Sequence, residues 1–171
     1  MALSVVESQG TQAYLVPVGT DLGYSDVTKR NDPAKVEAAI AAVGSKQINC
    51  LMDLGDISLG TRSVQEYTCM SSDNAFKSLG STSLANITPQ LLYKPDDVAG
   101  QADLRDMWDN KTRRIMIIVL NDEINPTTGS ATSITFEAAI SQPTLGVAKD
   151  NAVMYNPTIE ICTKPVLTEA S

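Results

Sequence analysis

The run RRIMIIVL at residues 113–120 constrains the fold more than any other stretch of the chain. Apolar side chains fill both of its alternating positions, and successive side chains of a strand point to opposite faces. A strand that is apolar on both faces must be covered on both sides. Just before it, residues 98–110 predict a short helix in which Leu104 and Trp108 lie one turn apart. From these two segments we expect four core anchors, which are Leu104, Trp108, Ile115 and Ile117.

Much of the remaining chain has the two-residue periodicity of β-strands. The clearest case is residues 132–141, where alternate apolar residues from Ile134 to Ile140 would face inward and Glu137 would face outward. Pro17, near the end of the first predicted strand, indicates an edge position because proline cannot donate to a ladder. The further predicted strands cover residues 10–18, 46–60, 62–70, 84–94 and 152–164.

A first helix is predicted over residues 33–43. Asp32 supplies an N-cap, Pro33 suits the first helical position, and Gly44 can close the helix in a left-handed conformation. Seven or so strands with two short helices indicate a single domain over residues 1–171. The predicted fold class is mainly β, a β-sandwich or barrel with one or two short flanking helices.

Two polar segments are predicted to lie outside this core. Residues 71–83 are rich in Ser, Gly, Asn and Asp and predict a long loop, and loops of this length in compact domains tend to be functional. Residues 165–171 are predicted to form an extended C-terminal arm.

Composition argues against several classes of function. Thirteen basic and twenty acidic residues give a net charge of −7, the wrong sign for tight binding of nucleic acid. The chain has no histidine, and therefore lacks the usual general base and the commonest metal ligand. We therefore expect no enzyme activity and no cofactor, with carboxylates or Cys69 as the remaining means of catalysis.

Cysteine use and hydropathy indicate where the chain belongs. Cys50, Cys69 and Cys162 are widely spaced and odd in number, which predicts reduced thiols in a cytoplasm rather than a disulfide framework or a zinc site. No apolar run approaches the roughly 18 residues needed to cross a bilayer. We expect no membrane segment.

The order of these pieces resembles the tail tube proteins of long, flexible-tailed bacteriophages, the lambda-like family. The resemblance covers about four-fifths of the chain. The helix at residues 33–43 departs from the family pattern. Four segments carry the resemblance: GTQAYLVPV, INCLMDLGDISLGTRSVQEYTCMSSD, LLYKPDDVAGQADLRDMWDNKTRRIMIIVLND and SITFEAAISQPTLGVAKDNAVMYNPTIEICTKP.

The resemblance implies a β-sandwich subunit that forms hexameric rings, stacked into a tube through which the phage genome leaves the virion. It implies assembly in the host cytoplasm and a final place in the virion tail. The implied partners are further copies of the chain, a tape measure protein in the lumen before ejection, and the tail terminator and distal tail proteins. Double-stranded DNA would pass without tight binding.

Residue roles follow from that implied architecture. A lumen that lets DNA pass should repel phosphate, and rotational symmetry turns each lumen carboxylate into a ring of like charge. The lumen-facing candidates are Glu66, Glu137 and Glu160. The basic group after the second helix would serve either helix-end compensation or salt bridges between subunits. The inter-subunit candidates come from the predicted loop at residues 71–83 and from this basic group. They are Ser71, Asp73, Phe76, Lys77, Lys111, Arg113 and Arg114.

Other functions remain open at this point. The nearest is a related tube-forming protein of a secretion or contractile injection system. Another phage β-sandwich protein, such as a tail terminator or a head decoration protein, is a further possibility. A soluble β-sandwich module for carbohydrate or protein is disfavoured, because one Trp and five Tyr provide few aromatic side chains to display on a binding face.

Overall fold

The computed structural model describes residues 7–68, 75–122, 131–148 and 151–169. Its centre is a seven-stranded antiparallel sheet in the order β2-β1-β8-β9-β12-β6, with β13 paired to β9. The chain is mainly β, as the sequence predicts. The strands of this large sheet are β1 (Glu7–Pro17), β2 (Lys46–Gln47), β6 (Asn86–Ile87), β8 (Arg114–Asn121), β9 (Ser133–Gln142), β12 (Thr158–Ile161) and β13 (Val166–Thr168).

Strand β8 lies inside the large sheet and is covered on both faces. Met116 and Ile118 face the larger core, which contains side chains of helix α2 (Gly100–Asp109). Ile115 and Ile117 face a second core, which is closed by helix α1 (Pro33–Ala41). The expectation that this strand is sandwiched between two layers is therefore confirmed.

A smaller, four-stranded sheet packs on the same face of the large sheet as α2. Leu91 and Tyr155 from this sheet are buried in the larger core. The body is thus a sandwich of two sheets with one helix on each side of the larger sheet. The small sheet has the order β10 (Leu145–Gly146), β11 (Met154–Tyr155), β7 (Gln90–Leu92) and β3 (Leu51–Asp53).

Helix α1 begins at Pro33 as predicted, whereas α2 begins at Gly100, two residues later than predicted. The Asp32 carboxylate accepts a hydrogen bond from the Ala34 N–H at 3.0 Å, and so caps α1. Helix α1 ends two residues early, with Ala42 in an extended conformation. Gly44 is not among the described residues with positive φ, so the predicted left-handed closure is wrong. At α2, the Asp97 carboxylate accepts hydrogen bonds from two N–H groups at the start of the helix.

Three predicted strands, at residues 46–60, 84–94 and 152–164, are each divided into two, because the chain crosses between the sheets. Residues 84–94 form β6 in the large sheet and β7 in the small sheet, with Pro89 between them. Residues 152–164 divide in the same way around Pro157, into β11 and β12. Proline lacks the N–H that a continuous ladder needs, so both breaks have a local cause.

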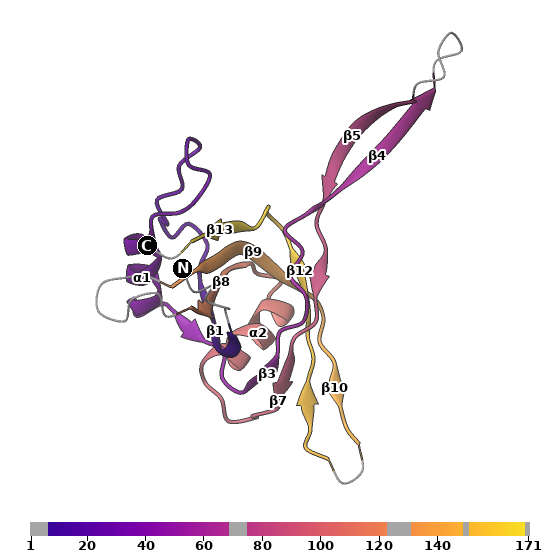
Figure 1. Cartoon of the computed structure of the whole chain (residues 1–171). Coiled ribbons are helices and arrows are strands. Elements are labelled where there is room, and N and C mark those ends of the chain that lie inside the picture. Colours follow the sequence, from indigo (N-terminus) through magenta and orange to yellow (C-terminus); the bar gives the residue numbers. More distant parts are fainter. Residues whose placement is uncertain (1–6, 69–74, 123–130, 149–150, 170–171) are drawn as a thin grey trace.

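The loop predicted at residues 71–83 is wrong over most of its length. Residues 75–83 form β5 (Ala75–Ser83), which pairs antiparallel with β4 (Thr61–Thr68) from Thr61↔Ser83 to Thr68↔Ala75. The pair is a separate two-stranded sheet that projects from the body (Figure 1), here named the β4–β5 ribbon. The sequence does not reveal β5 as a strand, because its exposed side chains are mostly polar. Backbone pairing with β4 holds the strand, and no buried face produces an apolar pattern. The candidates Ser71 and Asp73 lie outside the described residues.

The predicted C-terminal arm is also wrong where the structure describes it. Strand β13 pairs with the β9 segment around Ile134, beside the place where β12 leaves β9. Thr168 is buried, and its hydroxyl accepts a hydrogen bond from the Asn31 N–H at 3.2 Å. Residues 166–168 therefore belong to the body, because one polar contact and one short ladder hold them there.

Candidate functional site

The β4–β5 ribbon is the least supported element of the described chain. Every side chain in residues 61–66 and 77–83 is exposed. The two strands make extensive contacts only with each other. An isolated two-stranded hairpin is marginally stable in water at best. Within the described residues, no other element makes extensive contact with the ribbon, so further contacts would stabilise it.

The ribbon also displays apolar side chains. Val64 and Leu79 are cross-strand partners, and they are 57% and 63% exposed. Leu59, at the base of the ribbon, is also exposed. Scattered exposed apolar residues are ordinary, but a facing pair on a projecting element is suited to burial against another surface.

Two glycines shape the base of the ribbon. Gly60 has φ of +118°, which side-chain-bearing residues rarely adopt. A Cβ at Gly80 would lie 2.2 Å from the Ser63 hydroxyl oxygen, so a larger residue there would require the Ser63 side chain to move. A register shift between Arg62 and Val64 places an irregularity at the same point. The ribbon thus leaves the body through a turn and a bulge.

The large sheet contributes a second candidate surface, on the α1 side. Helix α1 covers the β1 and β8 part of this face, through Val36 and Ala39. Over β9 and β12 the face carries Glu137, opposite Ile115, and Glu160, opposite Ala139. Two of the three predicted lumen carboxylates therefore share one face, here named the β9–β12 acidic face. The third, Glu66, lies on the ribbon, where Lys77 is 4.0 Å away.

Both acids on this face are held by neighbouring groups. The Glu160 carboxylate accepts a hydrogen bond from the Ser141 hydroxyl at 2.6 Å. The Glu137 carboxylate lies 3.9 Å from the Arg113 guanidinium, and the Glu137 N–H donates to the Thr163 hydroxyl. These contacts orient the two carboxylates.

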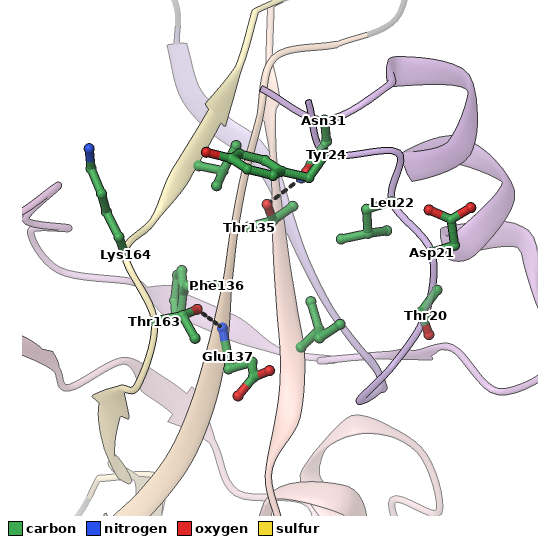
Figure 2. Close-up of a pocket in the computed structure, with 12 residues that line it drawn as sticks. Thr20, Asp21, Leu22, Tyr24, Asn31, Thr135, Phe136, Glu137, Thr163 and Lys164 are labelled. Atoms are coloured by element: carbon green, nitrogen blue, oxygen red, sulfur yellow. Dashed lines mark hydrogen bonds between the residues drawn. The ribbon is translucent and has the colours of Figure 1, made fainter. Parts of the chain in front are cut away.

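A hollow of about 380 Å³ lies beside the acidic face, between the loop at residues 20–31 and the segment at residues 163–166 (Figure 2). At one side of the hollow, the Asn31 amide donates to the Thr135 hydroxyl at 2.6 Å, and both residues are buried. At another, Lys35 forms an ion pair with Asp21. A hydrogen bond from Lys35, with help from the Gly23 N–H, lowers the pKa of Asp21 below its usual value. These contacts fasten the loop to the sheet through Asn31 and to α1 through Asp21.

The predicted basic group does not act as a single cluster. Arg114 is half-buried and lies 3.5 Å from Asp103 of α2, while Arg113 reaches towards Glu137 on the opposite face. Lys111 has φ of +53° in the turn after the helix. The structure therefore gives both arginines partners within the subunit, and an inter-subunit role for the group stays a prediction.

Trp108 is not a core anchor. Its side chain is 44% exposed, whereas Leu104, Ile115 and Ile117 are buried. The buried stripe of α2 continues from Leu104 to Met107, three residues on, and Trp108 lies in the last turn beside that stripe. It borders a second hollow of about 370 Å³, together with Ala139 and Ile140. Spacing of four residues is compatible with one helix face, but the buried side of α2 runs through Leu104 and Met107, three residues apart, and leaves Trp108 at its margin.

Sequence reasoning missed the apolar residues on the projecting elements. Val64 and Leu79 lie in segments for which the sequence predicts an ordinary strand and a loop. Leu145 and Val147, 52% and 77% exposed, lie in and next to β10. The alternation in residues 62–70 was a signal for a strand, but nothing in it distinguishes a buried strand from a projecting one. The side chain of the inter-subunit candidate Phe76 lies outside what the structure describes.

The described residues contain no group of three or more potential metal ligands among His, Cys, Asp and Glu. Within the same part of the chain, neither helix has the length and apolar character to cross a membrane.

Comparison with known proteins gives a likeness of fold. No protein-family model matches the chain, and no curated protein matches it. Among solved structures, a chain of the SPP1 tail tube superposes with a TM-score of 0.63 and 13% identity, over 96% of this chain and 80% of that one. A chain of the baseplate of the anti-feeding prophage gives a TM-score of 0.67 and 10% identity, over 99% and 98%.

A third neighbour comes from the sheath/tube terminator of PVC, an extracellular contractile injection system. It superposes with a TM-score of 0.65 and 11% identity, over 98% of this chain and 99% of that one. The expected tail-tube-like fold is confirmed by these likenesses. The neighbours come from contractile injection systems as well as from a tail tube, so the likeness is to a fold that tail tube and tube terminator proteins share.

Proposed function

We propose that this chain is a structural subunit of a phage tail tube, which assembles with copies of itself into hexameric rings that stack into a conduit for DNA. Its role is non-enzymatic, and its place is the virion tail. The partners follow as expected from the sequence: further copies, a tape measure protein inside the bore before ejection, and terminator and distal tail proteins at the ends.

The observation that carries this proposal is the β4–β5 ribbon. Between residues 61 and 83, every side chain whose exposure the structure describes lies in solvent. Such an element is not expected in a chain that functions alone. The Val64 and Leu79 side chains are 57% and 63% exposed, and burial of that remainder by a neighbouring copy would contribute about 1–2 kcal/mol each. The same burial would stabilise a ribbon that is marginal by itself.

The acidic face supplies the surface for the bore. On a symmetric ring, Glu137 and Glu160 would each be repeated around the axis, and the field of such rings repels phosphate. The net charge of −7 is consistent with a wall past which DNA moves without sticking. Glu66, on the ribbon, would lie where rings meet rather than on the sheet that lines the bore.

The test is microscopy of the purified protein, followed by charge reversal. We expect hexameric rings and hollow filaments at high protein concentration. Glu137→Lys combined with Glu160→Lys should leave tubes intact and slow DNA delivery, because a basic bore retains phosphate and the retention weakens with added salt. Asp56→Lys, at an exposed position outside the acidic face, is the matched control. A chain that stays monomeric at high concentration contradicts the proposal.

A tube terminator is the second candidate. It is favoured by the match to the PVC terminator over nearly the full length of both chains. A terminator forms a ring that ends a tube, so it would give single rings that do not stack on one another. The same micrographs distinguish the two functions.

A further inference from the structure

We infer that the β4–β5 ribbon of one copy docks on the β10–β11 projection of the next copy along the tube axis. The β10–β11 projection comprises the described residues 143–148 and 151–156. This inference rests on the proposed function and specifies the contact that would join one ring to the next.

The first argument is direction. The ribbon and the β10–β11 projection leave opposite ends of the body (Figure 1). When copies are stacked in the same orientation, the ribbon of one points towards the projection of the other. A contact between two different patches is heterologous. Each copy uses its ribbon towards one neighbour and its projection towards the other, so the contact can repeat along the stack. That is the geometry a tube requires.

The second argument is apolar matching. The β10–β11 projection exposes Leu145 and Val147, and the ribbon exposes Val64 and Leu79. Each pair is presented on a projecting element, away from the cores of its own subunit. Burying one pair against the other removes both from water in a single contact.

The third argument is free backbone. Strand β10 is the end strand of the small sheet, and no described strand pairs with its other side. Both outer edges of the ribbon are likewise without a strand partner among the described residues. Unpaired edges are templates for another strand, so an edge of the ribbon can add to β10 and extend the small sheet.

The fourth argument is charge. Segment 61–83 carries two basic and two acidic residues and is formally neutral, in a chain with a net charge of −7. The described residues of the β10–β11 projection carry no charged side chain. These two elements can therefore approach each other without the like-charge repulsion that acidic subunits otherwise experience.

The first experiment uses single charged substitutions at the two ends of the contact. Leu79→Asp and Val147→Asp should each leave the ring intact and raise the protein concentration needed for tubes by about tenfold or more, the change that roughly 1.4 kcal/mol per contact would give. Val27→Asp is the matched control, because Val27 is 93% exposed on a loop outside both elements. Normal tubes with Val147→Asp would overturn the inference, and so would an equal defect with Val27→Asp.

The second experiment tests whether the contact joins unlike surfaces. Rings of Leu79→Asp and of Val147→Asp, prepared separately and then mixed, retain one intact ribbon and one intact projection between them. They should form pairs of rings that neither variant forms alone. A chain with Leu79→Lys and Val147→Asp together should regain tubes through the new ion pair. No ring pairs and no recovery would place the docking site of the ribbon elsewhere.

These outcomes are separable from failure of the proposed function. If the unmodified chain forms no rings, the proposed function fails first. If it forms tubes that Val147→Asp leaves unchanged, the proposed function stands and only the docking site is wrong.

Discussion

Strand β9 and the β4–β5 ribbon are both built from alternating residues, yet their surroundings are opposite. The even-numbered positions of β9 from Ile134 to Ile140 are buried in the larger core, while Val64 and Leu79 on the ribbon are mostly exposed. The pattern of a strand specifies which side chains share a face. It does not specify whether that face is covered by the same chain or by a neighbour. In this protein the body holds the fold, and the ribbon carries the exposed apolar pair on which the proposed assembly rests.

The largest expected difference between the two regions is in hydrogen exchange. In the free subunit, amides of β9 should exchange only through global unfolding, with an opening free energy of about 5–15 kcal/mol. Amides of β4 and β5 should exchange with an opening free energy close to zero and become protected in tubes. Measurement on subunit and polymer tests this. Equal protection of the ribbon in both forms would break the comparison.

The next largest difference is expected in the free energy of unfolding when one apolar side chain is truncated in each region. Phe136→Ala removes a buried ring from the larger core and should lower the free energy of unfolding by about 3–5 kcal/mol. Leu79→Ala should change that free energy by no more than about 0.5 kcal/mol, but should weaken assembly. Urea titration of the subunit and light scattering of the polymer measure the two effects. A ribbon truncation that unfolds the subunit would show that the ribbon supports the body.

A smaller effect is expected from the polar contact that fastens the loop at residues 20–31 to the body. Asn31→Ala removes the donor to the buried Thr135 hydroxyl and should cost about 1–3 kcal/mol of unfolding free energy. Asn151→Ala, at an exposed position, is the control. A shift in the urea midpoint for Asn31→Ala without a shift for the control is the expected result. Equal midpoints would mean that the loop contributes nothing to the body.

The smallest effect concerns the pH dependence at the ion pair between Asp21 and Lys35. The pKa of Asp21 is lowered in the folded state, mainly by its hydrogen bond from Lys35, so its contribution is present above the usual pKa of 3.8 and is lost as pH falls through the folded value. The pKa of Lys35 is raised, mainly by the same hydrogen bond, so its contribution is present below 10.5 and is lost as pH rises through the folded value.

Asp21→Asn should therefore reduce the dependence of stability on pH at both ends of this range. Thermal unfolding as a function of pH measures it. The two groups are exposed, so we expect a slight change, and assembly by the ribbon should be unaffected. An assembly defect at neutral pH would connect this loop to the contacts between copies.

The body could be predicted from sequence to a large extent. The double coverage of β8, the inward set of β9 and the capping of α1 by Asp32 all follow from local patterns, because each depends on side chains a few residues apart. The divided strands around Pro89 and Pro157 were not predicted, since the exchange of a strand between two sheets depends on partners far along the chain. Trp108 is misplaced because spacings of three and of four residues both fit one helix face, and the core takes Met107 rather than Trp108.

The candidate site was predicted less well, for a related reason. The segment at residues 71–83 was correctly singled out as an element outside the core, but its strand β5 was missed because Lys77 and its serine-rich neighbours have no buried face to reveal them. Glu137 and Glu160 share a face because β9 and β12 are neighbours, which alternation alone does not establish. Exposed surfaces leave weaker patterns in a sequence than buried ones, because no core selects their side chains.

The measurement that tests the account most directly is removal of the ribbon. Thr61 and Ser83 are paired at its base, so residues 62–82 can be replaced by two glycines without moving the ends of the chain apart. We expect the shortened chain to unfold with the same midpoint as the full chain and to form no tubes under conditions where the full chain does. A shortened chain that polymerises into the same hollow filaments would contradict the claim that the ribbon joins the copies.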